Sequence, residues 1–188
     1  MPEKLKATKN DFGELLKQLV YHEGDQLLTL IDLPAMITPH FTLASMMDSA
    51  VEAVGWDKAR EIMYKSGYNT GYAYVSRLGK SWGVTGEELI KRYLRYENVR
   101  GWGPWEIIDL DVKTGKSTIK GHGGTRGEEG LLFGNFYRAK GVRKYADSFF
   151  AGLIAGMIHA ATGKKVKGTE RRCFAMEDLY CEFVTVPE

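Results

Sequence analysis

Apolar residues change their spacing part-way along this chain, and that change constrains the fold more than any other feature. In residues 42–98 they recur about every 3.6 positions, which is typical of helices that bury one face. In residues 105–186 short alternating runs, which are typical of strands, flank one further helical pattern. Helices and strands that are grouped in this way favour an α+β fold.

Local patterns predict where the individual elements begin and end. Gly55 and Trp56 interrupt the first long helical pattern, and Thr85, followed by Glu88, has the spacing of a capping box. Lys113-Thr-Gly115 joins two alternating runs, which indicates a hairpin turn. The expected helices are 11–21, two within 42–78, one from 85 to about 98, and 147–161; the expected strands are 27–37 (an edge or strand end, because of Pro34), 105–112, 116–120, 165–174 and 180–186.

The composition is that of a globular protein. A length of 188 residues, with 44% hydrophobic and 27% charged residues, supports one sizeable core, so we expect a single domain over residues 1–188. The 26 basic residues nearly cancel the 24 acidic ones, which argues against a nucleic-acid partner. No apolar run approaches the ~18 uncharged residues of a membrane span, and the charged start is unlike a secretory signal. We therefore expect a cytoplasmic location.

The second half of the 42–78 pattern carries a regular stripe of tyrosines and glycines. Tyr64, Tyr68 and Tyr72 are four residues apart, and Gly67 and Gly71 lie between them. On a helix this spacing places the tyrosines beside a strip of bare backbone, where something packs very closely. That neighbour is either another helix, in the core or at a dimer interface, or a ligand.

A glycine-rich stretch at 122–130 does not have the spacing of a phosphate-binding loop. Counted from Gly121, the GxGxxG pattern needs a glycine where Arg126 stands, and no Gly-Lys-Ser/Thr follows. We expect no nucleotide cofactor.

The two cysteines lie in the closing hairpin. If that hairpin is symmetric about Glu177, Cys173 and Cys181 lie opposite each other, with Cβ atoms roughly 4.5 to 5.5 Å apart. That separation suits two thiolates on one zinc ion and also admits a disulfide under oxidising conditions. From these residues alone the alternatives are two inert buried cysteines, a zinc site or redox chemistry. Glu170 lies three residues before Cys173, so strand alternation puts it on the opposite face unless a bulge or turn intervenes.

The tail resembles the signature of the 4-vinyl reductase domain family. The residues that carry the resemblance are DSFFAGLIAG at 147–156, GKKV at 163–166, ERRC at 170–173 and YCEF at 180–183, with a looser match at Gly101-Trp-Gly103. The resemblance implies an antiparallel sheet backed by helices, related to the vesicle-tethering TRAPP subunits and to the sensory domains of phenol- and xylene-responsive activators.

In those sensory domains the same tail pattern holds zinc, and the resemblance therefore implies a metal site here. Glu170, Cys173 and Cys181 match its ligands, and Asp147 stands where the pattern has a further cysteine. A carboxylate also binds zinc, so the implied set has two sulfurs and two oxygens, and four protein ligands make a structural rather than a catalytic site. Glu177 replaces the glycine that the family has in the hairpin turn.

Candidate ligand-binding residues come from the aromatic positions and one histidine. Trp102 and Trp105 flank the start of an expected strand, Phe150 lies on the apolar face of the last helix, and His122 begins the glycine-rich stretch. The tryptophans also suit plain core packing, and His122 suits an ordinary loop. As a ligand site, these residues would form an apolar wall with few polar groups.

We expect a binding module rather than an enzyme, and no residue is assigned a catalytic role. It would bind an apolar or aromatic small molecule, contain structural zinc and act through a homodimer or a partner protein. One alternative is a tetrapyrrole-handling subunit of a vinyl reductase, which would need an electron source from a partner. The other is an assembly subunit like the TRAPP proteins, with the tyrosine-and-glycine helix as its contact.

Overall fold

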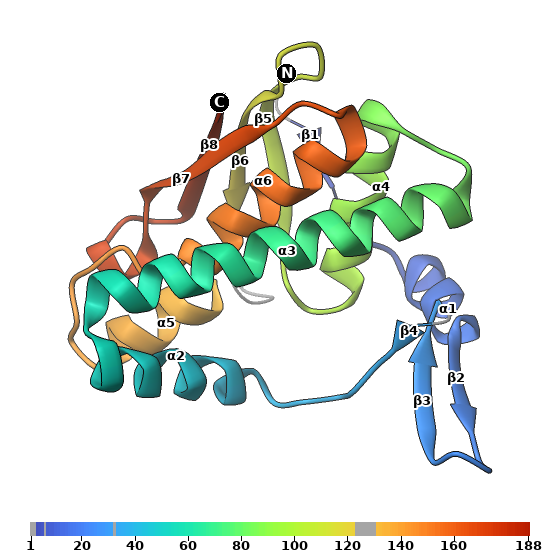
Figure 1. The fold of residues 1–188 in the computed structure, drawn as a ribbon, viewed down its shortest axis with the longest axis horizontal. Coiled ribbons are helices and arrows are strands. Elements are labelled where there is room, and N and C mark those ends of the chain that lie inside the picture. Colours follow the sequence, from blue (N-terminus) through green and yellow to red (C-terminus); the bar gives the residue numbers. More distant parts are fainter. Residues whose placement is uncertain (1–2, 6, 32, 123–130) are drawn as a thin grey trace.

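The computed structural model describes residues 3–5, 7–31, 33–122 and 131–188 (Figure 1). The glycine-rich stretch at 122–130, which we predict not to bind phosphate, therefore lies outside the described residues, apart from His122 itself. The helices are α1 Lys9–Lys17, α2 His40–Val54, α3 Trp56–Trp82, α4 Gly86–Val99, α5 Leu132–Ala139 and α6 Ser148–Thr162. The strands are β1 Glu3–Lys4, β2 Leu19–His22, β3 Leu27–Leu30, β4 Leu33–Pro34, β5 Trp105–Asp111, β6 Lys116–Gly121, β7 Val166–Arg172 and β8 Cys181–Pro187.

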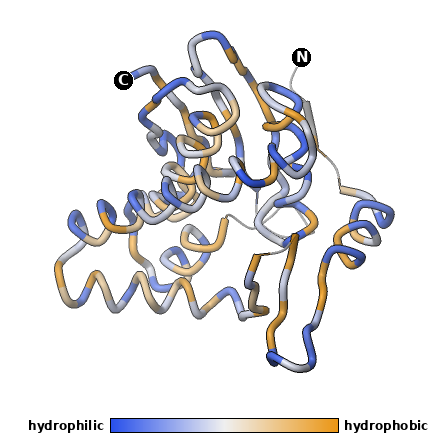
Figure 2. Tube along the Cα trace, turned by 45° about the vertical axis from the view of Figure 1, so that its right-hand side comes forward, coloured by the Kyte–Doolittle hydropathy of each residue, from blue (hydrophilic) through white to orange (hydrophobic). Residues whose placement is uncertain are grey.

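The strands form two antiparallel sheets. The larger has the order β1-β5-β6-β8-β7, and the smaller has the order β2-β3-β4. Helix α6 lies against the larger sheet and α3 packs on the other side of α6 (Figure 1). In Figure 2 the β2–β3 hairpin projects away from the larger sheet. The predicted α+β fold, with an antiparallel sheet backed by helices, is confirmed.

Helix α6 lies at the centre because its sequence is apolar on nearly every side. Its residues from Ser148 to Ile158, except Phe149, are buried. A helix that is hydrophobic all round is stable only inside a protein. Gly163 ends the helix in a left-handed conformation, with φ of 71°, as the Thr162-Gly163 pattern predicts.

Helices α3 and α6 approach each other through glycines on both sides. A Cβ atom on Gly67 would collide with the carbonyl oxygen of Phe149, and one on Gly152 would collide with the carbonyl oxygen of Tyr64. The stripe of tyrosines and glycines is therefore covered by another helix of the same chain. The strip of bare backbone at Gly67 and Gly71 is not exposed as a dimer contact or a ligand wall.

The structure differs from the expected elements at the N-terminal end. The helix expected over 11–21 ends at Lys17, because Leu19–His22 pairs with β3 as a strand. The strand expected over 27–37 is interrupted at Ile31, which has a positive φ of 54°. Thr85 precedes α4 as expected but makes no side-chain capping hydrogen bond. Helix α5 was not predicted.

Candidate functional site

Four buried side chains converge at the start of α6 and at the β7–β8 hairpin. They come from Asp147, Glu170, Cys173 and Cys181, and their ligand atoms all lie within 4.8 Å of one another. We call this group the candidate metal centre. Both cysteines and Asp147 have no exposed surface, and Glu170 is 5% exposed. The fold thus brings together the four residues that the resemblance of the tail predicted as metal ligands.

A bulge in β7 allows Glu170 to join the cysteines. The pairing of β7 with β8 shifts between Glu170, opposite Phe183, and Arg172, opposite Glu182. One extra residue in a strand turns the following side chains to the other face. Continued by one step, the register after the bulge places Cys173 opposite Cys181. The three-residue spacing between Glu170 and Cys173 predicted that a bulge or turn is needed to place both on one face, and this bulge meets that condition.

Asp147 links the two sulfur atoms. Its Oδ2 lies 3.2 Å from Sγ of Cys181 and 3.6 Å from Sγ of Cys173. Tetrahedral zinc, with bonds of about 2.3 Å to sulfur and about 2.0 Å to oxygen, places sulfur and oxygen ligands about 3.5 Å apart. The two separations are close to that value, so the donor set fits the ion.

Hydrogen bonds hold both carboxylates but leave oxygen atoms for a metal. Oε2 of Glu170 accepts from the backbone N–H of Asp147 at 3.0 Å, whereas its Oε1 is buried and has no hydrogen-bond partner in the described ranges. Oδ1 of Asp147 accepts from the backbone N–H of Gly134 at 3.3 Å. A buried acceptor without a donor is unfavourable, and a cation would satisfy it.

The electrostatics of these four side chains favour a cation. Burial raises the pKa of both carboxyl groups well above their usual range, and the nearby charges of Cys173 on Asp147, and of Asp147 on Glu170, raise it further. The hydrogen bond between the two thiols lowers the pKa of Cys173 to about 6 and raises that of Cys181. Four acidic groups that repel one another in a buried place are stabilised when a metal ion displaces their protons.

Gly134 of α5 also belongs to this site, and sequence reasoning missed it. A Cβ atom there would lie 2.9 Å from Oδ2 of Asp147 and 3.5 Å from Sγ of Cys181. The only sequence signal is a glycine inside the short apolar run LFGNF at 132–136. Helix α5 is eight residues long and is stabilised by its contacts with α2 and with the segment Phe174–Met176.

Glu177 occupies the left-handed turn position of the hairpin, with φ of 71°. A left-handed conformation is unfavourable by about 1–2 kcal/mol for a residue with a Cβ atom and not for glycine. We predict that Glu177→Gly raises the free energy of unfolding by about 1 kcal/mol in urea denaturation. Glu177→Ala, which removes only the exposed ion pair with Arg143, should not stabilise the protein, and equal effects of the two changes would contradict the argument.

Three of the four candidate ligand-binding residues lie together. The ring of Phe150 is 5.6 Å from the ring of Trp102 and 5.6 Å from that of Trp105. We define the aromatic cluster as these residues and the rings that touch them: Trp102, Trp105, Phe133, Phe149, Phe150 and Phe183. Within it, Nε1 of Trp105 is buried and has no hydrogen-bond acceptor among the residues that the structure describes.

His122 does not join the aromatic cluster. Its Nε2 lies 3.5 Å from a carboxylate oxygen of Glu106, and its ring is close to that of Tyr180. Glu106 follows Trp105 in β5, and successive residues of a strand face opposite sides of the sheet. His122 and Trp105 therefore lie on opposite faces.

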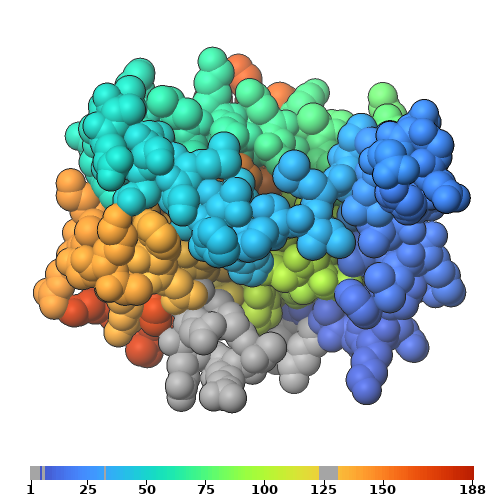
Figure 3. Space-filling model, turned by 90° about the horizontal axis from the view of Figure 1, so that it is seen from below, coloured from blue at the N-terminus to red at the C-terminus, as the bar shows by residue number. Residues whose placement is uncertain are grey.

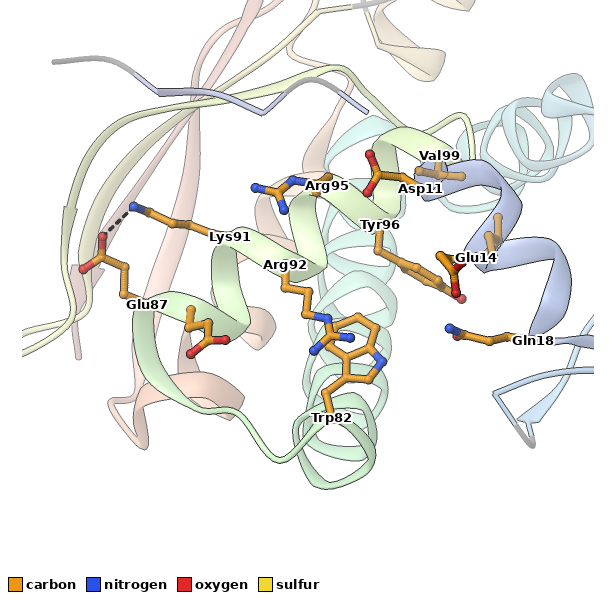
Figure 4. A pocket seen from close by; sticks show the side chains of 12 residues that line it. Asp11, Glu14, Gln18, Trp82, Glu87, Lys91, Arg92, Arg95, Tyr96 and Val99 are labelled. Carbon is orange, nitrogen blue, oxygen red and sulfur yellow. Dashed lines mark ion pairs between the residues drawn. The ribbon is translucent and has the colours of Figure 1, made fainter. Parts of the chain in front are cut away.

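We describe two hollows, neither of which is lined by the aromatic cluster. The larger, with a volume of about 610 Å³, lies between α1 and α4 (Figure 4). There the guanidinium group of Arg92 lies over Trp82, and Lys91 pairs with Glu87. The smaller, of about 460 Å³, lies between α3, α6 and β7 and borders Glu170.

Comparisons with known proteins show the fold. The chain aligns with a crystal structure of the phenol-responsive sensory domain of the transcription activator PoxR with phenol, with a TM-score of 0.77 and 14% identity over 95% of this chain and 89% of that one. It also aligns with a trafficking protein particle complex subunit 3 from Naegleria fowleri covalently bound to palmitic acid (TM-score 0.53, 14% identity, 79% and 95% coverage). A vinyl-4-reductase family protein from Methanocaldococcus jannaschii aligns with a TM-score of 0.46 at 14% identity, over 82% of this chain and 84% of that one.

Sequence comparisons add little to this. A family model described as a domain of unknown function, DUF5943, matches residues 23–108. No curated protein sequence matches the chain. Of the helices in the described ranges, none combines the length and the apolar composition that crossing a membrane requires.

Proposed function

We propose that residues 1–188 form one sensory or binding unit that takes a small aromatic molecule at the aromatic cluster and contains a structural zinc ion at the candidate metal centre. One continuous core, which runs from Leu5 to Phe183, supports a single unit. The fold shared with a domain whose structure contains phenol supports the class of ligand.

The observation that carries this proposal is the buried indole N–H of Trp105 without an acceptor. Leaving such a donor unpaired is unfavourable by about 1–3 kcal/mol. Because most of these rings are almost fully buried against one another, an aromatic molecule with one hydroxyl group would have to separate them in order to accept this hydrogen bond through its oxygen. Apolar walls with one or a few polar contacts are typical of small-molecule sites.

The candidate metal centre lies at the N-terminal end of α6, next to the aromatic cluster. Asp147 precedes the helix and Phe150 lies in its first turn, so a metal held by Asp147 would also hold the aromatic wall in place. Two thiolates and two carboxylates occupy all four positions of tetrahedral zinc. A closed set of this kind is structural, which agrees with a role in binding rather than catalysis.

An exposed apolar surface at the start of α2 and in the segment before it supports association with a second copy of the chain or with a partner protein. Met36, Ile37 and Phe41 are 80%, 85% and 66% exposed. The segment that contains them crosses the face of the molecule shown in Figure 3. Contiguous exposed apolar residues are typical of protein interfaces. The homodimer that we propose would use this surface rather than the glycine strip of α3.

Phenol titration tests the ligand site. We expect phenol to quench or shift the tryptophan fluorescence in a saturable way, and toluene, which has no oxygen, to bind more weakly. Trp105→Phe keeps an aromatic ring but removes the N–H group together with the pyrrole part of the indole, so it should weaken phenol binding about tenfold. Trp82→Phe, in the hollow between α1 and α4, is the matched control and should leave phenol affinity unchanged.

Calorimetry and sedimentation velocity complete the same experiment. The proposal is wrong if the wild-type protein binds no phenol by calorimetry, or if Trp105→Phe binds it as tightly as the wild type. Sedimentation with and without phenol reports whether ligand changes the association of the chain.

A further inference from the structure

The hollow between α3, α6 and β7 contains polar groups that the proposed function does not use. Arg60 of α3, Ser148 of α6 and Glu170 of β7 all line it. Within the part of the chain that the structure describes, one polar atom of each is buried without a hydrogen-bond partner: Nε of Arg60, Oγ of Ser148 and Oε1 of Glu170. Oε1 of Glu170 would bind the metal of the candidate metal centre. Nε of Arg60 and Oγ of Ser148 remain as unpaired donors.

The packing of the two helices explains why these donors meet. Helices α3 and α6 run parallel, with Tyr68 against Gly156 and Tyr64 against Gly152. One turn earlier, the same register places Arg60 beside Ser148. Ser148 is the first residue of α6, so Arg60 lies at the N-terminal end of that helix.

This end of α6 lacks its usual cap. Asp147 stands at the N-cap position but makes no capping hydrogen bond with its side chain, because its carboxylate faces Gly134 and the two thiols. The N-terminus of a helix carries a partial positive charge and favours anions. Ser148 is only 4% exposed, so its hydroxyl group has little access to water as an alternative partner.

Further donors surround the same hollow. The hydroxyl of Tyr64 accepts from the backbone N–H of Gly168 at 3.0 Å and keeps its own hydrogen as a donor. Lys167 lies at the rim and is exposed. Acidic groups are also near: Asp57 and Glu61 are exposed at the rim, with Glu61 paired to Lys58 at 2.6 Å. Together with Glu170, these carboxylates disfavour a dianion such as phosphate.

We infer that this hollow binds the carboxylate group of a small organic acid, with Arg60 and Ser148 as its donors. A guanidinium group offers two parallel N–H groups to the two oxygens of a carboxylate, and the serine hydroxyl would donate a third hydrogen bond. A volume of about 460 Å³ accommodates an acid of the size of benzoate, whose ring would lie near Tyr64 and Ala151. This site is independent of the aromatic cluster.

Benzoate binding to the zinc-loaded full chain, measured by calorimetry, tests this site. We expect Arg60→Gln to raise the Kd for benzoate at least about tenfold and Ser148→Ala to raise it several-fold. Arg143→Gln, which removes an exposed positive charge elsewhere on the surface, should not change it. Benzamide, which keeps the shape but lacks the charge, and inorganic phosphate should both bind more weakly than benzoate.

The inference is overturned if the wild type does not bind benzoate, or if benzamide binds as tightly as benzoate. It is also overturned if phosphate binds more tightly than benzoate, or if Arg60→Gln binds benzoate with wild-type affinity. Loss of benzoate binding in Trp105→Phe would place benzoate at the aromatic cluster, and would overturn this site while leaving the proposed function standing. If Arg60→Gln does not fold, as judged by circular dichroism and zinc content, Ser148→Ala carries the test.

Discussion

Cys181→Ser is expected to remove the zinc ion and to lower the midpoint of thermal unfolding by about 10 °C. The protein purified without an affinity metal should contain about one zinc per chain by mass spectrometry, and the variant almost none. Structural zinc contributes to folding free energy directly, and a loss of about 3 kcal/mol corresponds to roughly this shift for a chain of this size. The two sulfurs and Asp147 are fully buried, so water cannot replace the metal.

A chelator and a neighbouring carboxylate provide the controls. Stripping zinc from the wild type should bring its stability close to that of Cys181→Ser, whereas the chelator should not affect the variant. Asp178→Asn alters a carboxylate beside the centre that accepts from the backbone N–H of Cys173, and this variant should keep its zinc. If the wild type contains no zinc and Cys181→Ser is nearly as stable as the wild type, the cysteines are inert.

Gly152→Ala is expected to lower the free energy of unfolding by about 3 kcal/mol. The added methyl group would collide with the carbonyl oxygen of Tyr64, which belongs to a helix backbone and cannot rotate away. The two helices must then move apart along a tightly packed contact, and overpacking of this kind typically costs about 1–3 kcal/mol, occasionally more. Urea denaturation followed by circular dichroism measures the change.

Gly13→Ala in α1 is the matched control for this substitution. A Cβ atom there meets nothing within 4 Å, and alanine favours a helix over glycine by about 1 kcal/mol. This variant should be as stable as the wild type or slightly more stable. If Gly152→Ala is also as stable as the wild type, then α3 and α6 do not pack as closely as described.

Features that depend on a few neighbouring residues could be predicted from the sequence. The break at Gly55, the end of α6 at Gly163 and the hairpin at Gly115 follow from backbone conformations that glycine adopts readily. The glycine strip of α3 predicted a close neighbour, because a residue without a side chain allows another backbone to approach. Spacing also showed that Glu170 needs a bulge to reach the cysteines, and that bulge is present.

Features that depend on distant partners could not be predicted. Leu19–His22 has the apolar spacing of a helix and becomes a strand because β3 pairs with it. Helix α5 is too short to be recognised alone, and only its packing reveals that Gly134 borders the candidate metal centre. The resemblance of the tail, not residue spacing, pointed to Asp147.

The order of residues thus specified the hairpin turn at Gly115, the end of α6 and the placement of both cysteines in one hairpin, because these arise within short segments. Only the folded chain decided which polar groups lose contact with water. The unpaired N–H of Trp105, and the meeting of Arg60 with Ser148, depend on how α3, α6 and the sheet pack together. Burial is a property of that packing, and the chemistry proposed for both sites depends on it.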